Sequence, residues 1–121
     1  MAIQTLIVDD HDDIRLLLRL MLTREADIEV AGEAASGREA VAAYIDLQPS
    51  VIVLDEMMPG MNGLDVVRTL RERGDEPRVV LFSAHLDTHV RNEASELGVD
   101  LCVSKNEMDR VVSAVREVAS R

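Results

Sequence analysis

Aromatic residues and cysteine are scarce in this chain of 121 residues. It has one Phe, one Tyr and no Trp, so its core must be built from Leu, Val, Ile, Met and Ala. Cys102 is the only cysteine, which excludes an internal disulfide and fits a reducing cytoplasm. No apolar run approaches the ~20 residues of a membrane span, and the N-terminus lacks a signal-peptide pattern. We therefore predict a cytoplasmic protein that does not enter a membrane.

Basic residues are the scarcer charged class. The chain has 13 Lys and Arg against 23 Asp and Glu, a formal charge of −10 at pH 7 with a pI near 4.6. Binding to a phosphate backbone needs a basic face that releases counterions, so we predict no direct binding of nucleic acid by this chain. The length allows one compact domain, which we place at residues 1–121, and leaves no room for a second.

Short apolar runs alternate with segments of helical periodicity. Because both faces of these runs are apolar, we expect strands buried on both sides. The predicted strands are Thr5–Val8, Ile28–Val30, Val51–Leu54, Val79–Phe82 and Leu101–Val103. The predicted helices are Ile14–Leu22, a helix opened by a Ser36/Glu39 capping box and running to Leu47, Gly63–Gly74, Asp87–Leu97, and a final helix with an apolar stripe from Met108 to Ala119.

The order of these elements is βα repeated five times with short connections. Such alternation predicts an α/β fold, with a five-stranded parallel sheet covered by helices on both faces. Five strands are too few for a closed eight-stranded barrel, so we expect an open, doubly wound sheet. Ligands of such sheets bind beyond the carboxyl ends of the strands.

Charged and polar side chains follow four of the five predicted strands. Asp9 and Asp10 follow the first, Asp55 the third, Ser83 the fourth and Lys105 the fifth. Three adjacent carboxylates repel one another unless a cation is present. Because the ligands are all oxygen, we predict Mg²⁺ or Mn²⁺ rather than Zn²⁺. A carboxylate facing a phosphate donor can then act as nucleophile, with Lys105 and Ser83 holding phosphoryl oxygens, which points to aspartyl phosphorylation.

Four elements in this order resemble the receiver domain of two-component response regulators. They are Val8-Asp9-Asp10, the Asp-x-x-Met-Pro-Gly-x-x-Gly stretch from Asp55 to Gly63, Ser83-Ala84, and the segment from Gly98 to Lys105. The resemblance covers essentially the whole chain and implies the CheY-like, flavodoxin-like version of the fold. The segment from Ile28 to Ala34, followed by Gly37-Arg38-Glu39-Ala40, is most similar to the NarL/FixJ-like subgroup, whose receivers usually precede a helix-turn-helix domain.

The resemblance implies a role for each site residue. Asp55 would be the phosphoacceptor and a metal ligand, Asp10 a direct ligand, and Asp9 a ligand through water, with the backbone carbonyl of Met57 completing the metal shell. The donor would be the phosphohistidine of a histidine kinase. On this basis the chain is not a conventional enzyme but a phosphoacceptor that assists its own phosphorylation and dephosphorylation.

The resemblance also implies how the signal is passed on. Ser83 would be the switch hydroxyl and Lys105 would pair with the phosphoryl group. The phosphorylated form would control an output domain or partner protein, with a possible phosphorylation-dependent homodimer. The contact surface would lie on the last two helices and the strand between them. Two positions depart from the family: Asn106 follows Lys105 where Pro is common, and Cys102 replaces the usual Tyr or Phe.

Two alternatives remain open at this point. One is a receiver-like module that binds partners without phosphorylation, an alternative that the two departures keep open. The other is a haloacid-dehalogenase-like phosphatase, because Asp10-His11-Asp12 has its Asp-x-Asp spacing. An EF-hand is excluded because the segment lacks the required Gly and terminal Glu.

Several neighbouring residues have simpler expected roles. We treat His11 as a loop residue, and Asp12 and Asp13 as first-turn acids. The side chains of Met57, Met58 and Met61 are expected to pack and shape their loop.

Overall fold

The computed structural model describes residues 2–121 and contains all five predicted strands and all five predicted helices. None of the helices in this range is long and apolar enough to cross a bilayer. The strands are β1 (Ile3–Val8), β2 (Ile28–Ala34), β3 (Val51–Leu54), β4 (Val79–Ser83) and β5 (Leu101–Ser104). The helices are α1 (Asp12–Thr23), α2 (Gly37–Leu47), α3 (Gly63–Glu72), α4 (Thr88–Glu96), a 3₁₀ helix η1 (Lys105–Arg110) and α5 (Val111–Ala119).

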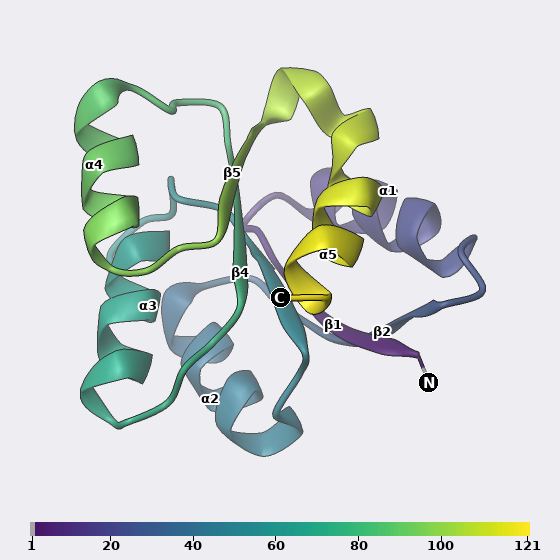
Figure 1. The fold of residues 1–121 in the computed structure, drawn as a ribbon, viewed down its shortest axis with the longest axis horizontal. Coiled ribbons are helices and arrows are strands. Elements are labelled where there is room, and N and C mark those ends of the chain that lie inside the picture. Colours follow the sequence, from purple (N-terminus) through teal and green to yellow (C-terminus); the bar gives the residue numbers. More distant parts are fainter. Residues whose placement is uncertain (1) are drawn as a thin grey trace.

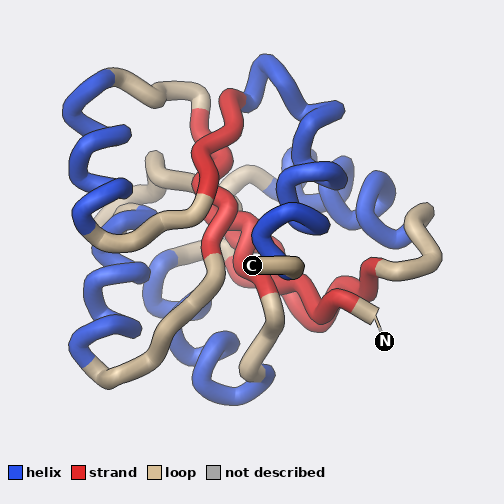
Figure 2. Tube along the Cα trace, in the orientation of Figure 1, coloured by secondary structure: helices blue, strands red, loops and turns tan. Residues whose placement is uncertain are grey.

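The strands form one parallel sheet in the order β2-β1-β3-β4-β5. Helices α1 and α5 lie on one side of it and α2, α3 and α4 on the other (Figure 1). Coloured by secondary structure, the strands form a single central layer between the helices (Figure 2). This arrangement confirms the predicted open, doubly wound α/β fold. All the strands therefore end at the same edge of the sheet, which brings residues far apart in sequence together.

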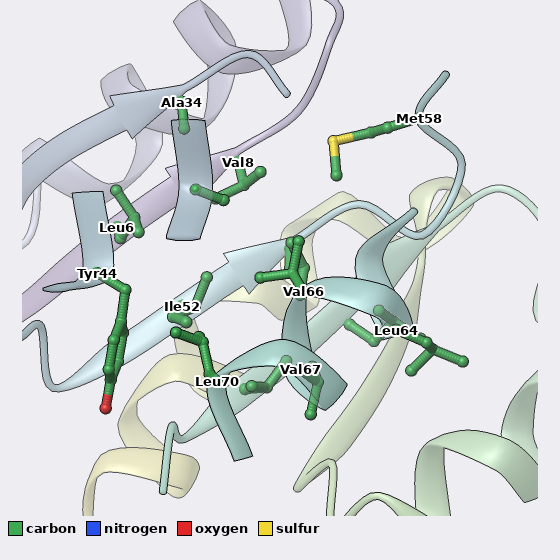
Figure 3. Close-up of a cluster of buried hydrophobic side chains, with 14 of the residues drawn as sticks. Leu6, Val8, Ala34, Tyr44, Ile52, Met58, Leu64, Val66, Val67 and Leu70 are labelled. Atoms are coloured by element: carbon green, nitrogen blue, oxygen red, sulfur yellow. The ribbon is translucent and has the colours of Figure 1, made fainter. Parts of the chain in front are cut away.

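The aliphatic core is divided by the sheet into two clusters. Successive residues of β1 alternate between them: Leu6 and Val8 belong to the cluster under α2 and α3, and Ile7 to the cluster under α1 and α5. Figure 3 shows the first cluster, where Tyr44 of α2 and Leu70 of α3 pack against the sheet. The only Phe, Phe82, is buried in the second cluster. Aliphatic side chains thus make both cores, as the composition predicts.

The helix boundaries differ from the predicted ones mainly in the last segment. The Ser36 cap of α2 is confirmed, since its hydroxyl accepts from the Glu39 amide at 3.2 Å. The final helix, however, begins at Val111 rather than Met108, and η1 precedes it. The Ser104 hydroxyl accepts from the Asn106 amide at 3.1 Å and starts this short helix, and Glu107 has a non-helical backbone inside it. The spacing of apolar residues alone does not predict such a local hydrogen bond.

Candidate metal centre at the carboxyl edge of the sheet

Two buried carboxylates lie just beyond neighbouring strands. Asp9 follows β1 and Asp55 follows β3, and their side chains are 0% and 1% exposed. Backbone hydrogen bonds extend the ladder past the strand ends: the Asp55 amide donates to the Val8 carbonyl at 3.0 Å, and the Asp9 amide to the Ala34 carbonyl at 3.1 Å. The sheet itself therefore fixes the separation of the two carboxylates.

Four side chains meet at this edge with possible metal-binding atoms. One such atom from each of Asp9, Asp10, His11 and Asp55 lies within 4.8 Å of the others. One oxygen of each carboxylate is buried and accepts no hydrogen bond from the backbone or from a neutral side chain: Asp9 Oδ2, Asp10 Oδ1 and Asp55 Oδ2. Opposite ligands on Mg²⁺ are about 4 Å apart. The spacing and the buried carboxylate oxygens therefore fit a single divalent cation.

Lys105 is the positive group closest to the buried carboxylates. Its Nζ lies 2.8 Å from Asp9 Oδ2 and 3.3 Å from Asp55 Oδ2. The ring of Phe82 lies beneath it, with 5.8 Å between Nζ and the ring centroid. Burial opposes the charged ammonium, but hydrogen bonding and attraction to the two carboxylates outweigh it and raise the pKa of Lys105. Lys105 is therefore held as a cation beside Asp55.

The surroundings of Asp55 disfavour the charged form of its carboxylate, so its pKa is raised. Burial raises its pKa, and the neighbouring charge of Asp9 raises it further, whereas Lys105 acts in the opposite direction. One ammonium therefore does not fully compensate two buried carboxylates. A second cation at this edge would favour the ionised form of Asp55, which is the form that can act as a nucleophile.

The loop between β3 and α3 fixes the backbone of Asp55. A Cβ atom on Gly63 would lie 2.4 Å from the Asp55 carbonyl oxygen, so only glycine allows this approach. The buried carboxylate of Glu56 accepts from the Leu64 amide at 2.8 Å, and burial raises its pKa. Asn62 and Asp65 complete a capping box at the start of α3. Neither the Glu56 hydrogen bond nor the capping box was predicted, although Asn-x-x-Asp before an apolar run signals such a box.

The three methionines of this loop have different surroundings. Met58 is buried in the core cluster and Met61 packs against it, as expected. The side chain of Met57, in contrast, is 55% exposed, so the prediction that it packs was wrong. Its backbone amide donates to Asp55 Oδ1 at 3.1 Å. Met57 thus contacts the site through its main chain, while the metal-binding role of its carbonyl stays a prediction.

Ser83 is buried at the end of β4, and its hydroxyl bonds to its own loop. Ser83 Oγ accepts from the His85 amide at 3.2 Å. In the β4–β5 ladder Ser83 is the partner of Ser104, which directly precedes Lys105. The predicted hydroxyl and ammonium therefore lie at the ends of adjacent strands. The role of Ser83 in switching stays a prediction.

The residues after Asp10 differ in whether they face the acidic cluster or the solvent. His11 belongs to the acidic cluster, whereas the expectation from sequence was an uninvolved loop residue. Asp12 is 92% exposed and pairs with Arg15, and it lies with Asp13 in the first turn of α1, as expected. Because Asp12 is turned to solvent, the Asp10-His11-Asp12 spacing does not form the paired carboxylates that a haloacid-dehalogenase-like phosphatase would use.

The two departures from the resemblance have defined local settings. Cys102 on β5 is half-buried against the first core cluster, and burial raises its pKa. It therefore serves as a small apolar side chain. The peptide bonds of residues 2–121 are all trans, including that between Lys105 and Asn106. Lys105 thus reaches the carboxylates without a cis bond.

Comparison with known proteins decides the family. The sequence model of one protein family, the response regulator receiver domain, matches residues 5–116 of this chain. The chain belongs to this family. This chain is 36% identical to the chemotaxis protein CheY of Thermotoga maritima over 120 residues, which cover 98% of this chain and 99% of CheY. It is 31% identical to the response regulator VraR of Staphylococcus aureus over 98% of this chain, but spans only 57% of VraR.

Solved structures agree with this assignment. The receiver domain of NarL from Mycobacterium tuberculosis superimposes with a TM-score of 0.92 at 29% identity, covering 98% of this chain and 97% of that one. A LuxR-family response regulator from Aurantimonas gives a TM-score of 0.93 at 26% identity, over 99% of this chain and 86% of the other. The resemblance stated from sequence, including its NarL-like neighbours, is confirmed.

Proposed function

We propose that Asp55 accepts a phosphoryl group from the phosphohistidine of a histidine kinase. A carboxylate oxygen of Asp55 attacks phosphorus, the phosphorus–nitrogen bond breaks, and its electron pair returns to the donor imidazole. The observation that carries this proposal is the group of three buried carboxylate oxygens for which Lys105, among the described residues, is the only nearby permanent positive charge. Such an arrangement is costly unless it serves a cation and an incoming anion.

The proposed metal ligands are Asp10 and Asp55 directly, Asp9 through water, and the backbone carbonyl of Met57. When bound, Mg²⁺ or Mn²⁺ would neutralise charge on the phosphoryl oxygens. Lys105 would contact another of these oxygens, and its ion pair with Asp55 would be exchanged for one with the phosphoryl group. In the proposal the chain thus assists its own phosphorylation and dephosphorylation without being a conventional enzyme.

Ser83 would report the modification. An aspartyl phosphate adds negative charge and acceptor oxygens, as phosphorylation does elsewhere. Ser83 Oγ, bonded to the His85 amide in the unmodified chain, would turn to a phosphoryl oxygen and draw the β4–α4 loop with it. The response would be a shift between two conformations.

The proposed partners are a histidine kinase and an output domain or partner protein in the cytoplasm, with a phosphorylation-dependent homodimer as a further possibility. The relatives include the full-length regulator VraR, of which this chain matches 57%. The contact surface would include α4, β5 and α5. Cys102 on β5 leaves no aromatic switch at that position, so the signal would pass through Ser83 and α4.

The test is incubation with acetyl phosphate and Mg²⁺, followed by mass spectrometry of the intact protein. We expect one phosphoryl adduct on Asp55 that is absent from Asp55→Ala. No adduct, or one that persists in Asp55→Ala, would overturn the proposal. Beryllofluoride separates it from a module that works without phosphorylation, because such a module would bind its partner equally with and without this phosphoryl mimic.

A further inference from the structure

We propose that the imidazole of His11 is an additional ligand of the cation at this site, and that it favours ions which accept nitrogen, such as Ni²⁺ and Co²⁺. The inference rests on the proposed function only in that Asp9, Asp10 and Asp55 hold a divalent cation. The observation that prompts it is the membership of His11 in the same 4.8 Å cluster as the three carboxylates.

The position of His11 is set by the loop after β1. Its Nδ1 lies 3.1 Å from Asp9 Oδ1 and 3.2 Å from Asp10 Oδ1. Its backbone amide also donates to Asp9 Oδ1 at 2.9 Å, which closes the turn and directs the side chain toward the carboxylates. Ligands adjacent to one another on a small divalent ion are about 3 Å apart, given bond lengths of roughly 2.1 Å. The ring nitrogen and Asp10 Oδ1, which belongs to a proposed direct ligand, are already at that spacing.

Helix capping does not account for a histidine here. His11 is the N-cap residue of α1, yet its side chain makes no capping hydrogen bond. Ser36, Asn62 and Asp87 cap α2, α3 and α4 through their side chains, as these residue types usually do. The imidazole of His11 instead lies at hydrogen-bond distance from Asp9 Oδ1 and within 3.2 Å of Asp10 Oδ1. It is also 61% exposed, so it can turn to meet an ion without disturbing the core.

The chemistry of the ligand predicts the selectivity. Mg²⁺ and Mn²⁺ prefer oxygen ligands, whereas imidazole nitrogen suits Ni²⁺, Zn²⁺ and related ions. An all-oxygen site of three carboxylates would distinguish these ions less than one that includes His11. The histidine would therefore strengthen binding of the nitrogen-accepting ions and leave Mg²⁺ nearly unaffected.

The test is calorimetric titration of the full chain with Mg²⁺, Ni²⁺ and Co²⁺ separately. Loss of residues that merely support a metal ligand costs about 10- to 100-fold in affinity, so loss of a direct ligand should cost at least about tenfold. We expect His11→Asn to weaken Ni²⁺ and Co²⁺ by that factor and Mg²⁺ by less than about twofold. The matched control is His89→Asn, which removes an exposed imidazole from α4 and should change nothing.

A spectroscopic readout tests the coordination of His11 in the wild-type chain directly. High-spin Co²⁺ shifts the proton resonances of a ligating imidazole strongly, and wild type should show such signals, which His11→Asn should lose. Their absence from wild type, or an equal change for all three ions in His11→Asn, overturns the inference. Asp10→Asn separates the two proposals: unchanged binding of all ions in that variant overturns the carboxylate site, and with it the role of His11.

Discussion

Helices α3 and α4 lie side by side on the same face of the sheet, but they are attached to it very differently (Figure 1). Five residues of α3 are buried, against Ala94 alone among the described residues of α4. The first turn of α3 is also fixed by the Asn62 capping box and by Glu56. Two polar contacts from α3 also reach this region: Arg68 donates to Glu93 on α4, and Arg71 donates to the Gly98 carbonyl just after α4.

This difference separates the two halves of the site. Asp55 lies in the loop that leads into the firmly packed α3, whereas Ser83 lies in the loop that leads into α4. Elements with little buried apolar area open at a lower free energy than the core does. The proposed phosphoacceptor is therefore held in place, while the helix that would report its state can move at small cost.

Shortening an apolar side chain in α3 and one in α4 should give the largest difference in the free energy of unfolding. Leu70 of α3 is fully buried, whereas Val90 of α4 is only partly buried against the same cluster. We expect Leu70→Ala to lower the free energy of unfolding by about 2–5 kcal/mol and Val90→Ala by about 1 kcal/mol or less. Urea unfolding followed by circular dichroism measures both. Equal losses would show that α4 is as well packed as α3.

Two glycine substitutions should separate a loss of folding stability from a loss in the rate of phosphorylation. In Gly63→Ala the new Cβ would meet the Asp55 carbonyl, so we expect a loss of about 1–3 kcal/mol and slower uptake of phosphate from acetyl phosphate. Gly60→Ala is the control, since its φ of +77° imposes a cost of about 1–2 kcal/mol without a nearby atom. If both variants take up phosphate at the same reduced rate, the close approach of Gly63 does not position Asp55.

The fold was predictable because each strand and most helices have their own local pattern. Continuous apolar runs such as Val51–Leu54 identify strands buried on both faces, and their alternation with helices leaves few topologies. The gathering of carboxylates, a hydroxyl and an ammonium at one edge followed from the strand ends. The part proposed for Met57, and the role of each residue, came from the family resemblance. The 3₁₀ helix before α5 was not predictable from periodicity, because one hydroxyl of Ser104 starts it. The position of His11 also depends on the turn that its own amide closes with Asp9.

The buried carboxylate of Asp55 should make stability depend on pH in a definite direction. Because burial raises its native pKa above that of the unfolded chain, its contribution to stability is complete at acid pH and is lost as the pH rises through the native pKa. Asp55→Asn cannot ionise, so without metal we expect it to gain stability relative to wild type between acid and neutral pH. Urea titrations across that range measure the difference. The control is Asp46→Asn, which removes an exposed carboxylate from α2.

At neutral pH, adding Mg²⁺ should make wild type more stable than Asp55→Asn, the reverse of the order expected without metal. A cation that binds only the native state stabilises it in proportion to the logarithm of its concentration above Kd. Wild type should therefore gain stability with Mg²⁺ and Asp55→Asn should gain less. An equal gain in both proteins would mean that the cation binds away from Asp55.

The smallest effect should come from the ion pair that joins the two helices. Arg68 Nη2 lies 3.1 Å from Glu93 Oε2, and Arg68 also pairs with Asp65 within α3. Both side chains are more than a third exposed, so a double-mutant cycle with Arg68→Gln and Glu93→Gln should give a coupling of about 0.2–1 kcal/mol that weakens with salt. Hydrogen exchange then locates the effect. Glu93→Gln should speed exchange of amides in α4 and leave those of α3 unchanged, because α3 keeps its buried residues and its cap. If exchange accelerates equally in both, the two helices open as one unit, and α4 cannot respond to the site independently of α3.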